Sequence, residues 1–294
     1  MNDFLVLENL NACGYSTVPR HNAMDIHICR LIMQTLGRFH GLSFVMRDQS
    51  AQQFQNLSAG LEETYYAPRL KPWYNDFLKT LLAIGEDAVS KVYGGTVIEE
   101  KAKKFILEGD LYDKMCKLTH TRNRFSVIGH GDTWTPNFLL HSEKIGDKEI
   151  PVSAKMIDFQ LARFSSPAID LSFFFYSCTT QELREEHFDE LIKTYYESLC
   201  DLVRDFGSNP EVLFPFSALQ EELRTSFRFG VGMAIESVTF SLLDDDEAPD
   251  MDSLQGEEVV PIQTIWIMKP IKSDEGRRRL ADVFKHATER GFLD

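Results

Sequence analysis

His130-Gly131-Asp132-Thr133-Trp134-Thr135-Pro136-Asn137, followed downstream by Met156-Ile157-Asp158-Phe159-Gln160, is the stretch that decides the fold. An Asp with an Asn five residues later supplies a carboxylate and a neutral oxygen ligand from one loop. A second Asp, Asp158, is predicted at the end of a strand that follows this loop. Carboxylate and amide oxygens suit Mg²⁺, and a positioned carboxylate can take the proton of an attacking hydroxyl. Phosphoryl transfer requires this combination of metal ligands and base.

The residues around these motifs alternate in the manner of short strands. Apolar runs at 125–128, 138–140 and 152–157 predict three strands, and the polar, Gly-containing stretch 142–149 predicts a surface turn between two of them. A further strand is predicted at Phe4–Leu7. Three- and four-residue apolar spacing, with Asp, Pro and Thr start signals, predicts helices elsewhere. The first three predicted helices cover about 25–46, 72–82 and 96–115. A fourth begins at about 167, and three more cover about 181–206, 217–243 and 273–290. We therefore expect an α+β fold that is mainly helical, with a small β insert.

Composition narrows the classes of partner and compartment. The net charge of −14 makes nucleic acid an improbable partner, because phosphate binding needs a basic surface. The sequence contains no run of about 18 apolar residues, so it predicts no membrane-spanning helix. Five scattered cysteines without a CxxC pair favour a reducing, cytoplasmic location. The acidic stretch 244–258 is interpreted as a solvated loop.

The two motifs, written HGDxWxxN and IDFQ, resemble the ecdysteroid-kinase-like family, within the choline-kinase-like (CHK) branch of the protein-kinase-like superfamily. The resemblance implies a protein-kinase-like C-terminal lobe whose catalytic loop lies on the β insert. It implies that Asp132 is the catalytic Asp, with Asn137 and Asp158 as Mg²⁺ ligands and ATP as phosphoryl donor. Asp170, in the tract 166–171, would support the catalytic loop, and His130 would serve packing and hydrogen bonding.

The start of the chain also carries part of the resemblance. Leu5–Leu10 is similar to the hinge strand of the family, where backbone groups near Glu8 and Leu10 would meet adenine. We expect residues 1–10 to be a hinge-strand remnant of the N-terminal lobe and residues 11–294 to form the C-terminal lobe. A Gly-rich loop, a strand Lys and its helix Glu partner do not precede this hinge, so turnover by residues 1–294 is doubtful on these grounds.

Each residue singled out also has a structural interpretation. Asp132 and Asn137 resemble common turn and cap residues when taken alone, and only the surrounding pattern favours catalysis. Trp134 is interpreted as a packed aromatic rather than a stacking platform. His40 is interpreted as a hydrogen-bonded core histidine, and Phe173–Tyr176 as core.

The function expected is ATP- and Mg²⁺-dependent phosphorylation of a small-molecule hydroxyl, with a steroid as one acceptor implied by the resemblance. The alternative is a catalytically inactive kinase-like binding module or a truncated product. Metal-dependent hydrolysis is disfavoured, because the sequence supplies no His-rich cage.

Overall fold

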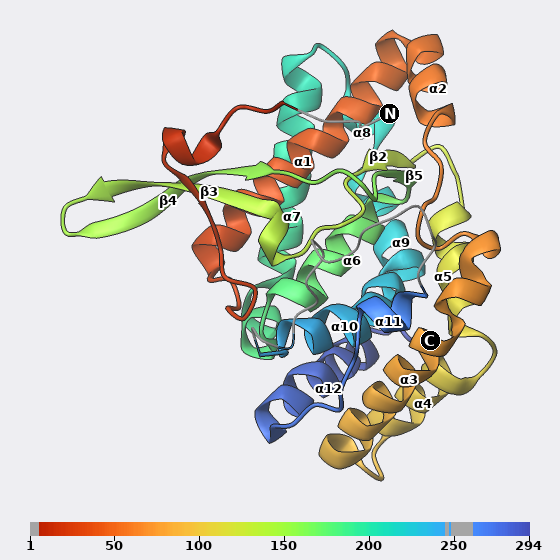
Figure 1. Cartoon of the computed structure of the whole chain (residues 1–294). Coiled ribbons are helices and arrows are strands. Elements are labelled where there is room, and N and C mark those ends of the chain that lie inside the picture. The colour runs from red at the N-terminus through yellow and green to blue at the C-terminus, as the bar shows by residue number, and fades with distance from the viewer. Residues whose placement is uncertain (1–5, 245–246, 248–260) are drawn as a thin grey trace.

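The computed structural model describes residues 6–244, 247 and 261–294 (Figure 1). The helices are α1 (Ile26–Gln49), α2 (Ala51–Ala59), α3 (Lys71–Tyr93), α4 (Val97–Leu107), α5 (Leu111–His120), α6 (Pro167–Cys178), α7 (Gln181–Asp205), α8 (Pro210–Leu213), α9 (Phe216–Ser226), α10 (Arg228–Ser241), α11 (Ile262–Ile265) and α12 (Asp274–Glu289). Three 3₁₀ turns, η1 (Leu10–Cys13), η2 (Pro68–Leu70) and η3 (Thr135–Asn137), link other elements. The α+β, mainly helical fold class is confirmed.

Two small antiparallel sheets lie among the helices. The first has the order β1 (Tyr15–Thr17), β3 (Phe138–Ile145), β4 (Lys148–Met156), and the second pairs β2 (Val127–Gly129) with β5 (Arg163–Ser165). Figure 1 shows the β3–β4 hairpin projecting from the helical body. Phe138 pairs with Met156 at the inner end of the hairpin. The residues that precede β3 and follow β4 are thus brought side by side.

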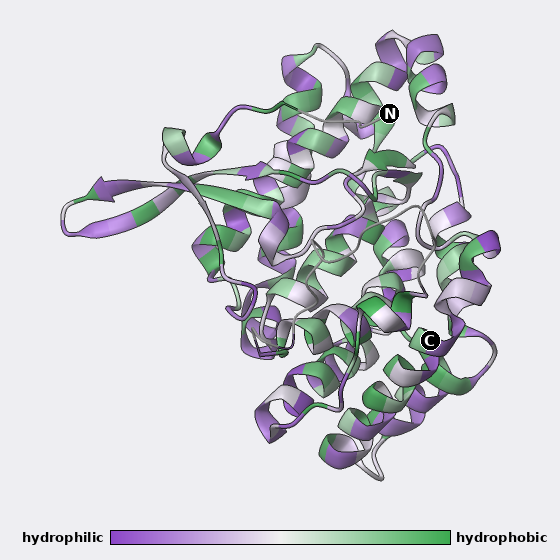
Figure 2. Cartoon of the chain, in the orientation of Figure 1, coloured by the Kyte–Doolittle hydropathy of each residue, from purple (hydrophilic) through white to green (hydrophobic). Residues whose placement is uncertain are grey.

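The core forms around α6, every residue of which is buried. Phe173–Tyr176 belongs to this core, as predicted. Gly230 of α10 packs so closely on α6 that a Cβ atom there would lie 2.2 Å from the carbonyl oxygen of Ser172. In Figure 2, hydrophobic stretches gather along the packed helices, whereas the tip of the hairpin is mainly hydrophilic. No helix in the part of the chain that the structure describes is long and apolar enough to cross a membrane.

Several predicted starts and ends agree with the structure. Asp25 caps α1 by accepting the N–H of Ile28 at 2.9 Å. Gly291 after α12 has φ +71°, and the N–H of Phe292 reaches the carbonyl of Ala287 at 2.8 Å. The ring of Phe292 then lies 4.6 Å from that of Phe227, a hydrophobic contact of the kind that accompanies a glycine cap.

Other predicted boundaries are wrong. The helix predicted over 96–115 breaks at Gly109, whose φ of +70° separates α4 from α5. The helix predicted over 217–243 divides at Phe227 into α9 and α10, because the N–H of Gly230 turns to the Ser172 hydroxyl at 3.0 Å. The predicted turn at 142–149 is mostly strand, and only Gly146 and Asp147 turn.

The predicted N-terminal strand is also not confirmed. Phe4 and Leu5 lie outside the described residues, while Val6 and Leu7 are exposed and have no strand structure. The first strand is instead β1, which pairs with the edge of β3 and which the sequence pattern did not reveal. The acidic stretch interpreted as a solvated loop, 244–258, lies outside the described residues except at Asp244 and Glu247.

Candidate active site

A buried carboxylate holds the start of the motif loop. Asp170 lies in the first turn of α6 and is 2% exposed. Its two oxygens accept the backbone N–H groups of His130 at 2.6 Å and Gly131 at 2.9 Å. His40 donates to the same carboxylate through Nε2 at 3.1 Å and meets the Tyr195 hydroxyl through Nδ1 at 2.9 Å. Burial alone would raise the pKa of Asp170, but these donors bring it below its ordinary value.

Gly131 adopts a backbone conformation that favours glycine and has no room for a Cβ atom. Its φ is +84°, and a Cβ atom there would lie 1.8 Å from the carbonyl oxygen of Leu161. The segment after Asp158 therefore passes directly against the motif loop. The His-Gly-Asp sequence reflects this close approach of two backbones.

His130 connects the two motifs. It is fully buried; its Nδ1 accepts the N–H of Asp132 at 3.2 Å and its Nε2 donates to the carbonyl of Ile157 at 2.8 Å. Burial lowers the pKa of His130, so the neutral form that these two bonds require is favoured. These contacts fit the predicted packing and hydrogen-bonding role.

The motif loop places Asp132 and Asn137 in direct contact. Asn137 Nδ2 donates to the carbonyl of Asp132 at 2.9 Å and to its Oδ2 at 2.8 Å. Both amide hydrogens are thus engaged, which leaves Oδ1 of Asn137 as an acceptor. Burial raises the pKa of Asp132 to about 6, so the group is mainly an ionised carboxylate at neutral pH yet a stronger base than an exposed Asp.

Asp158 follows β4 in a conformation that is rare for side-chain-bearing residues. Its φ is +63°, the one positive value outside glycine among the residues described. This left-handed residue reverses the chain, so that Phe159 lies between His130 and Phe39 with ring centroids 4.5 and 5.6 Å away. The N–H of Ile157 bonds the carbonyl of Asn137 at 3.0 Å, which fixes the two motifs together.

The residues present fit a hard divalent cation. Asp158 is exposed and offers a carboxylate, and Asn137 offers its amide oxygen. No three His, Cys, Asp or Glu side chains converge to hold a metal within 6–244 and 261–294. A site of this kind suits Mg²⁺. Proteins commonly bind this ion through one or two carboxylates, while phosphate oxygens and water complete its coordination shell.

Asp132, Asn137 and Asp158 open into one cavity of about 370 Å³. Its walls are mainly aromatic and apolar side chains from α3, α6, α10 and α11. Trp134 belongs to this wall and contacts Phe240 with ring centroids 5.7 Å apart. The predicted packing role for Trp134 is thus observed, but the same side chain also faces the cavity.

Sequence reasoning missed a second buried carboxyl in the same cavity. Glu236 of α10 is 7% exposed and accepts the hydroxyls of Tyr65 at 2.6 Å and Tyr74 at 2.7 Å. Burial raises its pKa to about 7. Glu63 positions Tyr65 by accepting its N–H at 2.9 Å and forms a buried ion pair with Arg163 at 3.1 Å. A Glu inside an apolar helix run was the only available signal.

The motifs, their contacts and the helical surroundings agree with one protein family. The family model described as "ecdysteroid kinase-like family" matches residues 1–208. This chain belongs to the ecdysteroid kinase-like family. Membership indicates kinase-like phosphotransferase chemistry, and such families generally use ATP and Mg²⁺. Comparison with curated proteins and with solved structures gives no match.

The ecdysteroid kinase-like match includes the predicted adenine-binding residues, but the structure does not bring these into the cavity. Glu8 is exposed and lies before η1, and Leu10 is half-buried in η1. Neither lines the cavity that contains Asp132. The predicted contacts with adenine, and the division of the chain at residue 10, stay predictions.

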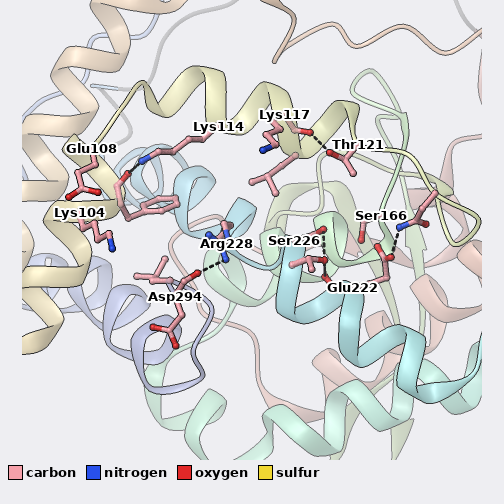
Figure 3. A pocket seen from close by; sticks show the side chains of 15 residues that line it. Lys104, Glu108, Lys114, Lys117, Thr121, Ser166, Glu222, Ser226, Arg228 and Asp294 are labelled. Atoms are coloured by element: carbon pink, nitrogen blue, oxygen red, sulfur yellow. Dashed lines mark hydrogen bonds between the residues drawn. The ribbon is translucent and has the colours of Figure 1, made fainter.

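Another cavity lies away from the ecdysteroid kinase-like motif residues. It measures about 510 Å³ and is bordered by α4, α5, α9 and the C-terminal residues (Figure 3). Its charges are mixed: Lys114 donates to the Phe105 carbonyl at 2.8 Å, and Arg228 to the Asp294 carbonyl at 2.9 Å. Glu222 on its wall is bonded to Asn123 at 2.7 Å. None of the predicted site residues lines this cavity.

Proposed function

We propose that this chain is an ATP- and Mg²⁺-dependent phosphotransferase that phosphorylates a hydroxyl group of a small molecule. The supporting observation is that Asp132, Asn137 and Asp158 all line one cavity with apolar walls. The cavity volume of about 370 Å³ lies in the range of small-molecule sites. A steroid alcohol is the first acceptor to test, because its body is apolar and its reacting group is a hydroxyl.

Asp132 is proposed to act as the base. The acceptor hydroxyl would donate its proton to an oxygen of Asp132 as the acceptor oxygen forms a bond to the γ-phosphorus. The bond between that phosphorus and the β–γ bridging oxygen breaks, and ADP takes the bonding electrons. Asn137, bonded to Oδ2 of Asp132, orients the carboxylate for this role.

Asn137 and Asp158 are proposed to hold Mg²⁺. When bound, Mg²⁺ supplies positive charge that neutralises phosphate oxygens. The chain prepares these ligands through its own contacts: the left-handed backbone at Asp158, the bond between Ile157 and Asn137, and the rigid His130 beneath them.

The test is to incubate the purified chain with Mg-ATP and a panel of alcohols that includes steroids, and to search for phosphate monoesters by mass spectrometry. We expect a monoester from at least one alcohol in low yield, because the sequence supplies no Gly-rich loop or strand Lys to hold the phosphates, and we expect its loss in Asp158→Asn. The matched control is Asp147→Asn, because Asp147 is exposed in the hairpin turn. No monoester from any alcohol, with Mg²⁺ and nucleotide still bound, would instead favour a kinase-like binding module.

We also propose that the protein is cytoplasmic. All five cysteines are free thiols, and Cys29, Cys116, Cys178 and Cys200 are buried in the core rather than paired. Fractionation of cells that produce the full chain would test this location, and recovery in a secreted or organelle fraction would refute it.

A further inference from the structure

We infer that Glu236 selects the acceptor: the cavity takes alcohols whose apolar body carries a second hydrogen-bond donor without negative charge, and rejects anionic alcohols. This inference rests on the proposed function, since it treats the cavity beside Asp132 as the acceptor site. It assigns to Glu236 a recognition role separate from the chemistry at the motif loop.

The bonding of Glu236 leaves capacity for a ligand. In its ionised form the Glu236 carboxylate offers about four acceptor positions. The hydroxyls of Tyr65 and Tyr74 occupy one position on each oxygen, at 2.6 and 2.7 Å. Glu236 lines the cavity, so a donor on a bound molecule can take one of the remaining positions. The two tyrosines also fix the direction in which the carboxylate points.

The charge around Glu236 is unbalanced. Glu236 is only 7% exposed, and no Lys, Arg or His of the described part of the chain forms an ion pair with it. A buried carboxyl without a cation is costly, and such groups are typical of functional sites. The cavity wall carries three carboxyl groups, those of Asp132, Asp158 and Glu236, and no basic side chain among the described residues. A carboxylate or phosphate at the Glu236 end of the acceptor would be repelled by the Glu236 carboxylate.

The aromatic side chains of the cavity wall favour an acceptor with an apolar body. Trp73, Trp134 and Trp266 line the cavity together with Phe173 and Phe240. Flat aromatic side chains give large apolar contact to a ring or chain. An acceptor that spans from Asp132 to Glu236 would lie against these rings, with one polar group at each end.

The three tryptophans are also the only ones in the sequence, so intrinsic fluorescence reports binding in this cavity. Four probes share a trans-1,4-disubstituted cyclohexane with a hydroxymethyl group at one end. The other end carries a methyl, hydroxymethyl, aminomethyl or carboxylate group. Titration needs neither ATP nor turnover.

We expect the hydroxymethyl and aminomethyl probes to bind more tightly than the methyl probe, the amine by about 10-fold or more, as a charge-assisted hydrogen bond allows. The carboxylate probe should bind most weakly. Glu236→Gln should reduce the advantage of the amine to within about threefold, and should strengthen binding of the carboxylate probe. Glu222→Gln is the control, since Glu222 is also buried but lines the other cavity, and it should leave the series unchanged.

The inference is overturned if the methyl or carboxylate probe binds as tightly as the two donors. It is also overturned if Glu236→Gln keeps the full discrimination, or if no probe changes the fluorescence at millimolar concentration. Should Glu236→Gln fail to fold, the probe series on the unaltered chain decides. Selective binding without phosphorylation of the bound alcohol by Mg-ATP would refute the proposed function and leave this recognition role standing.

Discussion

Replacing Asp170 with Asn should destabilise the fold strongly, although the two side chains have nearly the same shape. The Asp170 carboxylate accepts the N–H groups of His130 and Gly131 and the Nε2 proton of His40. An Asn side chain keeps one acceptor oxygen, and its NH₂ group would face donors instead. One or two of the three bonds are then lost, depending on which oxygen the amide keeps, and at least one buried N–H donor is left unsatisfied. We expect a loss of about 3–5 kcal/mol in the free energy of unfolding.

Urea unfolding with linear extrapolation measures this loss. Asp113→Asn is the matched control, because Asp113 is mostly exposed and pairs with Lys71 at 2.7 Å on the surface. The control should cost about 1 kcal/mol or less. A loss for Asp170→Asn no larger than that of the control would refute the reasoning, since it would mean that the motif loop does not depend on this carboxylate.

The pH dependence of the difference in unfolding free energy between wild type and Asp170→Asn gives a second check. The pKa of Asp170 in the folded chain lies below its ordinary value, despite burial, because His40 and the loop N–H groups donate to it. Its contribution is therefore fully present above about pH 4, the ordinary Asp range, and is lost as the pH falls through the folded pKa. The gap between wild type and Asp170→Asn should be constant from neutral pH to about pH 5 and narrow only under stronger acid.

Three further predictions concern the motif residues. Asp158→Asn should weaken Mg²⁺ binding more than Asn137→Ala, since an ionised carboxylate binds a hard dication more strongly than an amide does; equal affinities in a metal titration would contradict the assignment. Asp132→Asn should lower turnover by roughly 10² to 10⁴ with little change in nucleotide affinity, and activity within a few-fold of wild type would exclude Asp132 as the base. Gly131→Ala should destabilise the chain by more than about 3 kcal/mol, whereas Gly146→Ala, at φ +64° with no atom near its missing Cβ, should cost only about 1–2 kcal/mol by urea unfolding.

The sequence pattern could predict that Asp132, Asn137 and Asp158 come together, because these residues are close in the chain or joined by one hairpin. Asp132 and Asn137 lie on the same loop, and pairing of Phe138 with Met156 brings Asp158 beside them. Apolar spacing likewise located most helices. It could not reveal β1, because three residues pair with β3 far along the chain and carry no periodic signal of their own.

Most of the features that the sequence does not predict are contacts between residues far apart in the chain. The bond from His40 to Asp170 joins α1 to α6, and the Glu63–Arg163 pair joins the segment before α3 to β5. The sequence predicts a core His40 and a supporting Asp170, but it does not predict that they bond to each other. Glu63 and Arg163 have the ordinary appearance of exposed polar residues, and only the fold shows that they are buried and therefore need a partner.

Glu236 shows most directly why an acceptor site is harder to predict than a reaction loop. The loop must present fixed groups to a phosphate, so its residue types and spacing are constrained together. The acceptor wall needs only a suitable shape and a few polar groups, which helices from any part of the chain can supply. Tyr65, Tyr74 and Glu236 meet because the segment before α3, the first turn of α3 and the middle of α10 pack together. The motif therefore supports the proposed reaction, and under that proposal the packing of helices would determine which alcohol reaches Asp132.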